Sequence, residues 1–203
     1  MSWYPVSLNL KGRNCLIVGG GKVAERKLKS LIKAEANVTL IAPEINSELK
    51  RMHELGDFHY LKSSYQKNDV NGFFLVIAAT DCSEINSAIG ADAEAESILF
   101  NSVNSSEYSN FYPAAASRCG DIQLAVSSNG QNPYLAKKIR KYLDQKFDDS
   151  LQEEVLELGR LRNQLVQESA GFSEQEKKTL MKVRLLEKVE SFLEKIDNKT
   201  WKL

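Results

Sequence analysis

The chain has 203 residues, of which 42% are hydrophobic and 27% charged, values that are ordinary for a globular protein. Its 27 basic and 27 acidic residues balance to a formal net charge of zero, so neither nucleic acid nor a membrane surface is a predicted partner. No apolar run approaches the ~20 residues that span a bilayer. The length is enough for one domain of ordinary size with a smaller appendage.

The N-terminus and the cysteines indicate the compartment and redox state. The first residues, MSWYPVSLNLKGRN, have no basic region followed by an apolar core, so no signal peptide is predicted. Cys15, Cys82 and Cys119 are odd in number and scattered, which indicates reduced thiols and a cytoplasmic protein. None of them has the spacing of a metal site, and no metal site is predicted.

Strand-like and helix-like segments alternate through the first ~110 residues, the pattern of a parallel α/β sheet. Pro43 stops the second strand, Gly56 ends the second helix, and Ser83 is predicted to cap the third. Right-handed crossovers give the strand order 3-2-1-4-5, a Rossmann-type sheet. The predicted strands span residues 14–18, 37–42, 58–61, 73–79 and 98–103, and the predicted helices span 23–33, 45–55 and 84–95.

The pattern changes after Phe111. Residues 122–127 alternate in hydrophobicity and predict one more strand. The remainder is predicted to be amphipathic helix rather than a second sheet. The helix signals are Asn132 with Pro133 for a helix over 134–147, apolar periodicity over 151–166, a break at Gly171, and a capping box from Ser173 to Glu176 for the last helix.

The most informative stretch is CLIVGGGKVAE, residues 15–25. A buried-strand pattern leads into three glycines and a helix pattern begins at Lys22, an arrangement that places a pyrophosphate on helix N-terminal amides. In this G-x-G-x-x-A fingerprint, Gly19 permits the turn, Gly21 lets the backbone approach phosphate, and Ala24 is small enough to pack the helix on the strand. Two interpretations stay open: a dinucleotide site, or a glycine turn that only packs the βα unit.

An open parallel sheet binds its ligand beyond the carboxyl ends of the strands, at the switch point between the first and fourth strands. Groups at four strand ends are therefore predicted to surround a dinucleotide. The predicted cofactor-binding residues are Gly19, Gly20, Gly21, Lys22, Val23, Ala24, Pro43, Glu44, Thr80, Asp81, Asn101 and Val103.

Two acidic residues at these strand ends have alternative interpretations. Glu44 either accepts a hydrogen bond from the ribose 2′-hydroxyl or is a solvated acid at a helix start. No arginine stands beside it and Arg51 comes one helix later, which favours NAD over NADP as the predicted cofactor. Asp81 either lies beside the cofactor or caps the next helix.

Other chemistries find little support in the sequence. His53 and His59 fall near an outer helix and an edge strand, where surface positions are usual. No serine-histidine-acid set stands at a readable spacing. The helix after Pro133 is basic, and with Arg118 it either faces an acidic ligand or presents a solvated face; its basic residues are Lys137, Lys138, Arg140 and Lys141.

These motifs together resemble those of the precorrin-2 dehydrogenases, the family of siroheme-synthase N-terminal modules. The matching stretches run in family order from the N-terminus to residue 147. The segments after the sheet are more specific than the glycine fingerprint. The matches are Pro5 with Leu8, CLIVGGGKVAERK, VTLIAPE, IAATD, LFNSV, Phe111-x-Pro113-Ala114, Gly120-Asp121, LAVSSNG and NPYLAKKIRKYL.

The resemblance implies NAD⁺-dependent oxidation of precorrin-2 to sirohydrochlorin, with Fe²⁺ as a further substrate ion in those members that also make siroheme. It implies a homodimer whose active cleft lies between a Rossmann domain at 1–113, a dimerisation and tetrapyrrole-site region at 114–147, and a helical region at 148–203. Precorrin-2 is a polycarboxylate, which gives basic residues a reason to face it. The predicted substrate-binding residues are Arg118, Ser127, Ser128, Lys137 and Arg140.

One departure from the family pattern bears on catalysis. The family commonly has an aspartate after the fifth strand, in an N-x-V-D pattern, where this chain has Asn101-Ser102-Val103-Asn104. An amide cannot serve as a general base. Three explanations stay open: Asp81 or another acid substitutes, water takes the proton so that no base is needed, or the chain is weakened or repurposed for binding; the second is favoured. The predicted catalytic residues are Asn104, which would orient the substrate, and Asp81.

Three functions remain as alternatives. The leading prediction is a precorrin-2 dehydrogenase; a bifunctional enzyme that also inserts iron ranks lower because of Asn104, and a non-catalytic NAD-sensing module is the rival from another class. The segments LAVSSNG and NPYLAKKIRKYL favour the enzyme, since a sensor would not need a tetrapyrrole region. A dehydrogenase of alcohols or hydroxy acids lacks a visible catalytic residue set. Ser128 would bind the substrate by a hydrogen bond, or only its own backbone as a turn serine.

Overall fold

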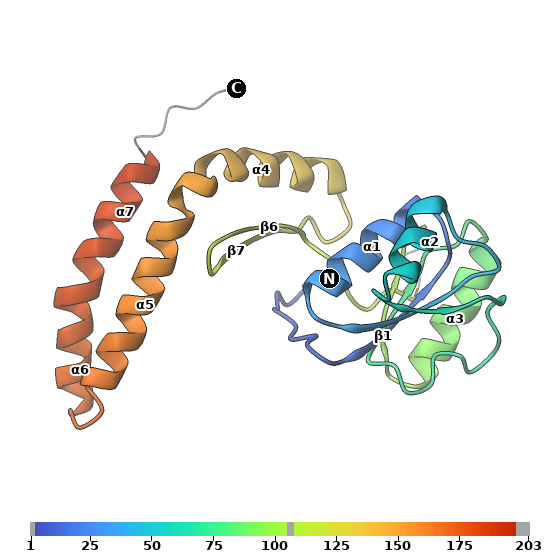
Figure 1. The fold of residues 1–203 in the computed structure, drawn as a ribbon, viewed down its shortest axis with the longest axis horizontal. Helices are drawn as coiled ribbons and strands as arrows, with labels where there is room; N and C mark the ends of the chain where they lie inside the picture. The colour runs from blue at the N-terminus through green and yellow to red at the C-terminus, as the bar shows by residue number, and fades with distance from the viewer. Residues whose placement is uncertain (1–2, 105–107, 198–203) are drawn as a thin grey trace. The chain divides into compact units, whose positions relative to one another are not determined.

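The computed structural model describes residues 3–104 and 108–197, and it divides the chain into two compact units, Met1–Tyr112 and Pro113–Leu203 (Figure 1). The first unit holds a five-stranded sheet, and the second holds a two-stranded hairpin followed by helices. The predicted α/β class with a C-terminal helical region is therefore confirmed. The subdivision of the second unit at residue 148 stays a prediction.

All five strands of the first unit run parallel in the order β3-β2-β1-β4-β5, as the right-handed crossovers predict. The central strands β1 and β4 are continuous apolar runs because both of their faces are buried. The strands are β1 (Asn14–Val18), β2 (Asn37–Ile41), β3 (His59–Leu61), β4 (Leu75–Ala78) and β5 (Leu99–Ser102).

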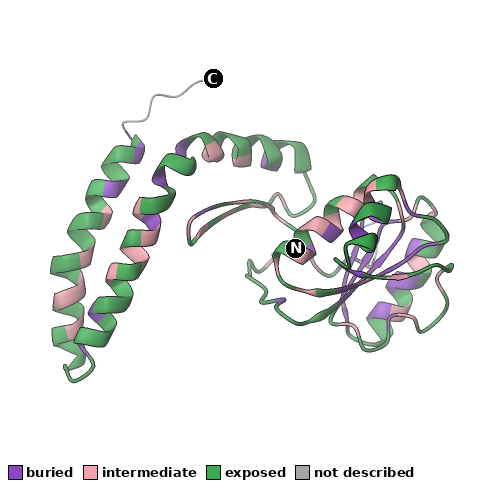
Figure 2. Cartoon of the chain, viewed as in Figure 1, coloured by how far each residue is buried: buried purple, intermediate pink, exposed green. Residues whose placement is uncertain are grey.

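Alternate residues of the central strand enter two separate cores, one on each face of the sheet, and the strands are its most buried part (Figure 2). Cys15 and Ile17 pack with the first two helices on one face. Leu16 and Val18 pack with the third helix on the other face. The helices therefore leave the carboxyl ends of the strands to loops. They are α1 (Lys22–Lys33), α2 (Ser47–Glu54) and α3 (Ser83–Ala95).

The starts of α2 and α3 differ in how they are capped. The Asn46 side-chain oxygen accepts a hydrogen bond of 2.9 Å from the Leu49 backbone N–H and so caps α2. The prediction that Ser83 caps α3 is wrong, because the helix begins one residue earlier than its hydrophobic pattern. Cys82 holds the N-cap position without a side-chain cap, so the interpretation of Asp81 as the cap is not supported either.

The segment that joins β3 to β4, residues 62–74, forms neither helix nor strand. Val70 in this segment is fully buried, and Tyr65 and Phe73 pack against the core on the α3 side of the sheet. This crossover segment therefore covers part of that face in the place of a helix.

The second unit opens with an antiparallel hairpin of β6 (Ala115–Cys119) and β7 (Ile122–Val126). The sequence predicts β7 but misses β6, because AASRC shows no apolar alternation. One face of the hairpin is half-buried against α4 (Pro133–Lys146), and the other, which carries Arg118, is exposed. Asn132 caps α4 and a proline occupies its first turn, as predicted.

Helices complete the second unit, and α5 and α7 lie side by side (Figure 1). The predicted capping box is confirmed: the Ser173 N–H donates to Glu176 Oε2 at 2.8 Å. Among the residues that the structure describes, no helix is both long and apolar enough to cross a bilayer. The elements are η1 (Asp149–Leu151), α5 (Gln152–Glu168), α6 (Glu174–Met181), the π-helical segment η2 (Lys182–Leu186) and α7 (Glu187–Asp197).

A small core ties the last helix to the hairpin. Phe192 and Ile196 of α7 pack with Cys119 of β6 and with Leu151 and Val155. At the end of α4 a buried lysine donates a hydrogen bond of 3.2 Å from its Nζ to the Ile196 carbonyl. A cation at the C-terminus of a helix satisfies carbonyl groups that have no partner within the helix.

Candidate functional site

A cavity of about 680 Å³ lies at the carboxyl ends of β1, β2 and β4. This is the edge at which an open parallel sheet binds its ligand. Nine of the predicted cofactor-binding residues line the cavity: Gly19, Gly20, Gly21, Lys22, Val23, Pro43, Glu44, Thr80 and Asp81.

The three other predicted cofactor-binding residues do not line this cavity. Ala24 is fully buried where α1 packs on the sheet, the position that requires a small residue. Asn101 is buried, and its Nδ2 donates a structural hydrogen bond of 3.2 Å to the Phe111 carbonyl. Val103 is exposed just beyond the end of β5. A cofactor contact by Asn101 or Val103 stays a prediction.

Gly19 and Gly20 are required by the protein itself. Gly19 has a φ of +127°, and a Cβ there would stand 2.3 Å from the Ala79 carbonyl oxygen. A Cβ on Gly20 would stand 1.9 Å from the Glu44 carbonyl oxygen. Because no side chain fits at such distances, the glycine loop can approach the ends of β4 and β2 only with glycine at both positions.

Gly21 differs, because none of the residues that the structure describes requires a glycine there. Its φ is −90°, which any residue adopts, and a Cβ would meet no described atom within 4 Å. Gly21 is also the N-cap of α1, and no side chain caps that helix. The first N–H groups of α1 can therefore bind an anion that comes close to the backbone. These features fit the pyrophosphate of a dinucleotide.

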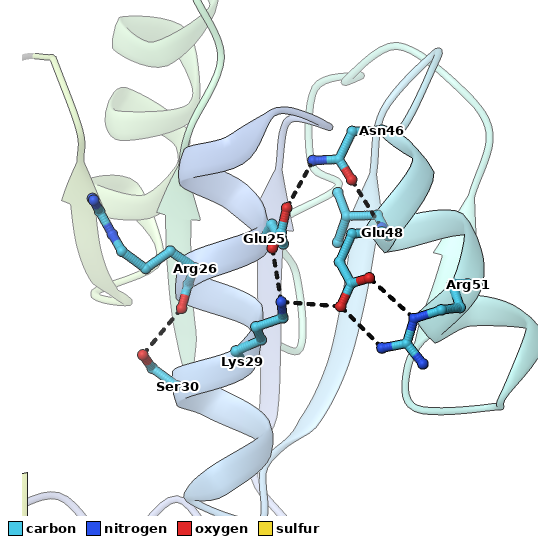
Figure 3. A network of polar contacts seen from close by, with 8 residues as sticks. Glu25, Arg26, Lys29, Ser30, Asn46, Glu48 and Arg51 are labelled. Carbon is cyan, nitrogen blue, oxygen red and sulfur yellow. Dashed lines mark hydrogen bonds and ion pairs between the residues drawn. The ribbon is translucent and has the colours of Figure 1, made fainter.

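A polar network beside the cavity joins α1 to α2 (Figure 3). Asn46, which lines the cavity, donates from Nδ2 to Glu25 Oε2 at 3.1 Å. Lys29 Nζ lies 2.8 Å from Glu25 Oε1 and 3.1 Å from Glu48 Oε1. Arg51 donates two hydrogen bonds to Glu48, of 2.9 and 3.0 Å. The network therefore fixes the start of α2 against α1 and engages two cations with carboxylates.

The charges in this network reinforce one another. Hydrogen bonds from Arg51 and then from Lys29 lower the pKa of Glu48 to about 2. The hydrogen bond from Lys29 lowers the pKa of Glu25, and the carboxylates raise the pKa of Lys29. All four groups are charged at neutral pH. Because they are also reached by solvent, salt weakens their attraction.

A second network joins the ends of β4 and β5 through α3. Asn86, which is 1% exposed, accepts from the Thr80 hydroxyl at 2.7 Å and donates from Nδ2 to the Thr80 carbonyl at 3.0 Å. Its Nδ2 also donates to Asn104 Oδ1 at 2.7 Å. Asn104 Oδ1 accepts from the Ser102 hydroxyl at 3.0 Å, and Asn104 Nδ2 donates to the Thr80 carbonyl at 3.4 Å. Both polar atoms of the Asn104 amide are thus hydrogen-bonded within the chain.

The two predicted catalytic residues therefore differ in their surroundings. Asp81 is an exposed carboxylate that lines the cavity. Asn104 is exposed, does not line the cavity, and has its amide oriented by Asn86. A role in catalysis stays a prediction for both.

The predicted substrate-binding residues all belong to the second unit, where they are dispersed. Arg118 lies on the hairpin face that α4 does not cover. Lys137 is exposed on α4, and Arg140 on the same helix is half-buried in an ion pair with Asp144. Within this unit Arg118 is therefore separated from the basic residues of α4 by the hairpin, and the structure does not gather the basic residues into one cluster.

The two predicted serines make local turn bonds. Ser128 Oγ accepts from the Asn132 backbone N–H at 3.0 Å, and Ser127 Oγ accepts from the Asn129 backbone N–H at 3.1 Å. The bond of Ser128 is the one that its alternative interpretation as a turn serine predicts. The Ser127 hydroxyl also donates to Asn129 Oδ1 at 3.3 Å, whereas the Ser128 hydroxyl still has a hydrogen to donate, so a substrate contact by Ser128 is compatible with this geometry.

Sequence reasoning missed four residues that shape the site: Asn46, Tyr65, Ile85 and Asn86. Asn46 could have been found as a cap, because it directly precedes a helix pattern. Asn86 could also have been found, because it is a polar residue on the otherwise apolar face of α3 that packs against the sheet. Tyr65 has none, since its position depends on the path of a segment without regular structure.

The described residues offer no cluster for a metal ion, and the thiols of Cys15 and Cys119 are buried. Among the described residues, no three His, Cys, Asp or Glu side chains are grouped as metal ligands would be. His53 and His59 are exposed, as predicted. Burial raises the pKa of the Cys15 thiol to about 11, which keeps it protonated and unreactive.

Comparison with known protein families indicates which class of ligand suits the cavity. A family described as "Putative NAD(P)-binding" matches residues 6–115, which is more than half of the chain. The chain belongs to this NAD(P)-binding family. The glycine loop and the whole five-stranded sheet lie within the matched residues.

Relatives and a solved structure extend the likeness into the second unit. The siroheme synthase of Chromobacterium violaceum is 40% identical over 144 residues, which are 71% of this chain and 31% of that protein. Siroheme synthase 1 of Yersinia enterocolitica is 35% identical over 175 residues, 86% of this chain and 37% of that protein. The chain thus spans about a third of the length of these curated relatives.

The solved structure of "SirC, precorrin-2 dehydrogenase" is 26% identical, with a TM-score of 0.73 over 96% of this chain and 99% of that one. The family resemblance deduced from the motifs is confirmed by these matches.

Substitutions in the glycine loop are expected to separate folding from binding. Gly20→Ala should lower the free energy of unfolding by about 3 kcal/mol or more, because its methyl group overlaps the Glu44 carbonyl. Gly21→Ala should lower it by no more than about 1 kcal/mol, yet weaken NAD⁺ binding by about tenfold or more. Urea unfolding and calorimetric titration measure the two effects. Unchanged NAD⁺ affinity in Gly21→Ala would contradict the assignment of Gly21 to the ligand.

The carboxylate network is expected to stabilise the fold only above acidic pH. Since the folded pKa of Glu48 lies below its usual value of 4.5, its contribution is present above pH 4.5 and is lost as the pH falls towards 2. Glu48→Gln should therefore be less stable than the unchanged chain at pH 7, with a gap that closes over that range and shrinks in high salt. Glu54→Gln on the same helix, outside the network, should show no such gap in urea unfolding.

Proposed function

We propose that the chain is an NAD⁺-dependent dehydrogenase that oxidises precorrin-2 to sirohydrochlorin. The observation that carries the proposal is the likeness to the precorrin-2 dehydrogenase SirC over nearly the full length of both chains. That likeness includes the second unit, which lies almost wholly beyond the residues matched by the NAD(P)-binding family. A module that only senses a nucleotide would have no need of this second unit.

The charges around the cavity support NAD⁺ over NADP⁺. The glycine loop and the start of α1 would hold the pyrophosphate, and Lys22 is the one Lys or Arg among the described residues that line the cavity. Glu44 and Asp81 place carboxylates on its walls. A 2′-phosphate needs a cation near the end of β2, but Lys29 and Arg51 of the neighbouring helices are already paired with carboxylates.

The chain's own residues position the cofactor and the substrate, and they do not act as a base. When bound, NAD⁺ supplies the acceptor for the hydride. Asn104 uses both amide atoms in hydrogen bonds within the chain and has no site for a proton. Asp81 at the cavity is open to solvent. The proton released on oxidation therefore passes to water, and no base is needed at position 104.

The second unit supplies groups for a polycarboxylate substrate. Arg118 and Lys137 are exposed cations, and an arginine can hold a carboxylate with two parallel hydrogen bonds. Arg140 contributes less because Asp144 already engages it. Ser128 keeps a hydroxyl hydrogen to donate.

The amide at position 104 favours oxidation without insertion of a metal ion. A carboxylate is a better ligand for a hard divalent cation than a neutral amide, and both polar atoms of Asn104 are engaged. Fe²⁺ as a substrate ion is therefore the less supported alternative.

Turnover of precorrin-2 tests the proposal directly. Anaerobic incubation of the purified chain with enzymatically generated precorrin-2 and NAD⁺ is expected to give the visible spectrum of sirohydrochlorin, faster than with NADP⁺. Insertion of Fe²⁺ or Co²⁺ should stay at the rate of a control without protein, since residue 104 carries no charge.

Absence of oxidation above the control would overturn this proposal. Asn104→Asp then separates the two remaining cases. Restored oxidation would mark an enzyme that lost its acid, whereas an inactive variant that still binds NAD⁺ would mark a binding module.

We also propose that the chain forms a homodimer through the second unit. A two-stranded hairpin is marginally stable by itself, and α4 leaves Tyr134, Leu135 and Ile139 40% to 70% exposed. Light scattering is expected to give twice the monomer mass of 22.8 kDa. Ile139→Lys should shift the chain to monomer, while Val183→Lys, at a more exposed apolar residue of η2, should not. A monomer at micromolar concentration would contradict the dimer.

A further inference from the structure

The crossover segment, residues 62–74, does more than connect two strands. Ser64 and Tyr65 of this segment line the cavity, although the segment has no regular structure of its own. A wall built on a loop needs side-chain contacts to hold its shape, because no backbone ladder fixes it.

Tyr65 has such contacts at both ends of its side chain. Its ring packs against the core on the α3 side of the sheet. Its hydroxyl donates a hydrogen bond of 2.6 Å to Asp92 Oδ2 on α3. Burial and then the bond to Asp92 raise the pKa of Tyr65, so the phenol stays protonated and remains a donor. The ring is therefore fixed between the core and α3.

An apolar side chain accompanies Tyr65 on this side of the cavity. Ile85 of α3 lines the cavity and is 38% exposed, so its side chain offers apolar surface to a ligand there. The glycine loop offers backbone N–H groups, which suit phosphate. An aromatic ring and an aliphatic side chain suit a flat, uncharged ring instead, because such rings stack and shed water there.

We propose that Tyr65, positioned by Asp92, is the wall against which the adenine ring of the dinucleotide packs. The proposal rests on NAD⁺ as the cofactor of the proposed function. Tyr65 touches the ligand, and Asp92 acts through Tyr65 as a positioning residue. The α3 helix thereby tunes the affinity of the adenine half without contacting the reacting end of the cofactor.

Binding of the two halves of the dinucleotide tests this assignment on the full chain. The probes are AMP, which carries the adenine ring, and nicotinamide mononucleotide, which does not; NMR titration measures both at millimolar concentrations. Tyr65→Ala should weaken AMP binding about tenfold or more, as expected for loss of a base–aromatic stack. It should leave the affinity for nicotinamide mononucleotide unchanged.

The hydrogen bond is tested by matched variants. Tyr65→Phe and Asp92→Ala each remove the bond and should each weaken AMP binding about threefold. The double variant should be no weaker than either single one, because the same bond is lost. Asp92→Asn keeps an acceptor for the hydroxyl and should restore the affinity of the unchanged chain. All of these variants keep an aromatic ring at position 65. They therefore still test the role of Tyr65 in AMP binding if Tyr65→Ala fails to fold.

Three results would overturn the assignment: AMP binding that is unchanged in Tyr65→Ala, equal weakening of both probes, or no AMP binding by the unchanged chain. Equal weakening would mean a general distortion of the cavity. If AMP binds as expected and precorrin-2 is not oxidised, the assignment of Tyr65 to the adenine ring is retained and the dehydrogenase proposal is rejected.

Discussion

The close approach of the glycine loop to two neighbouring main-chain segments is the constraint on which the site depends. Gly19 N–H donates to the Ile41 carbonyl at 2.9 Å, and Asn46 N–H donates to the Gly20 carbonyl at 3.0 Å. A side chain at either glycine would strike a carbonyl oxygen. The loop therefore cannot move away without breaking backbone hydrogen bonds, nor can it bear a side chain. One local contact thus sets where α1 begins, where α2 begins, and which backbone amides face the cavity.

The α3 helix carries the second part of the site. Asn86 lies in the same row as Ile89 and Ala93, where an apolar residue would pack well against the sheet. An apolar residue there would remove the hydrogen bonds that the Thr80 hydroxyl, the Thr80 carbonyl and Asn104 Oδ1 make with the Asn86 side chain, and hydrophobic packing would not replace these bonds between the ends of β4 and β5. Asp92 on the same helix holds Tyr65. The helix thus accepts polar positions on its inner side because they orient the ends of β4 and β5 and the crossover segment.

Strong periodic patterns made the sheet predictable, and tertiary contacts account for what was missed. The apolar runs of β1 and β4, the glycine fingerprint and the handedness of the crossovers were enough for the strand order. β6 was missed because AASRC gains its strand character from pairing with β7 and from α4, not from its own pattern. The cavity residues of the glycine loop were predictable because their motif is local. Tyr65 was not, since its contacts with Asp92 and the core join parts that are distant in sequence.

The residue at position 104 can change from a carboxylate to an amide without altering the cofactor cavity. The pattern around Asn104 has two donors facing Oδ1 and one carbonyl facing Nδ2, which is the pattern that an amide satisfies. A carboxylate there would set its second oxygen against the Thr80 carbonyl, which disfavours the charged form. The network is therefore complete with an amide, and Thr80 keeps its place on the cavity wall. Such a site still suits hydride transfer, which depends on placing two rings together, and it disfavours any step that needs a negative charge at this strand end.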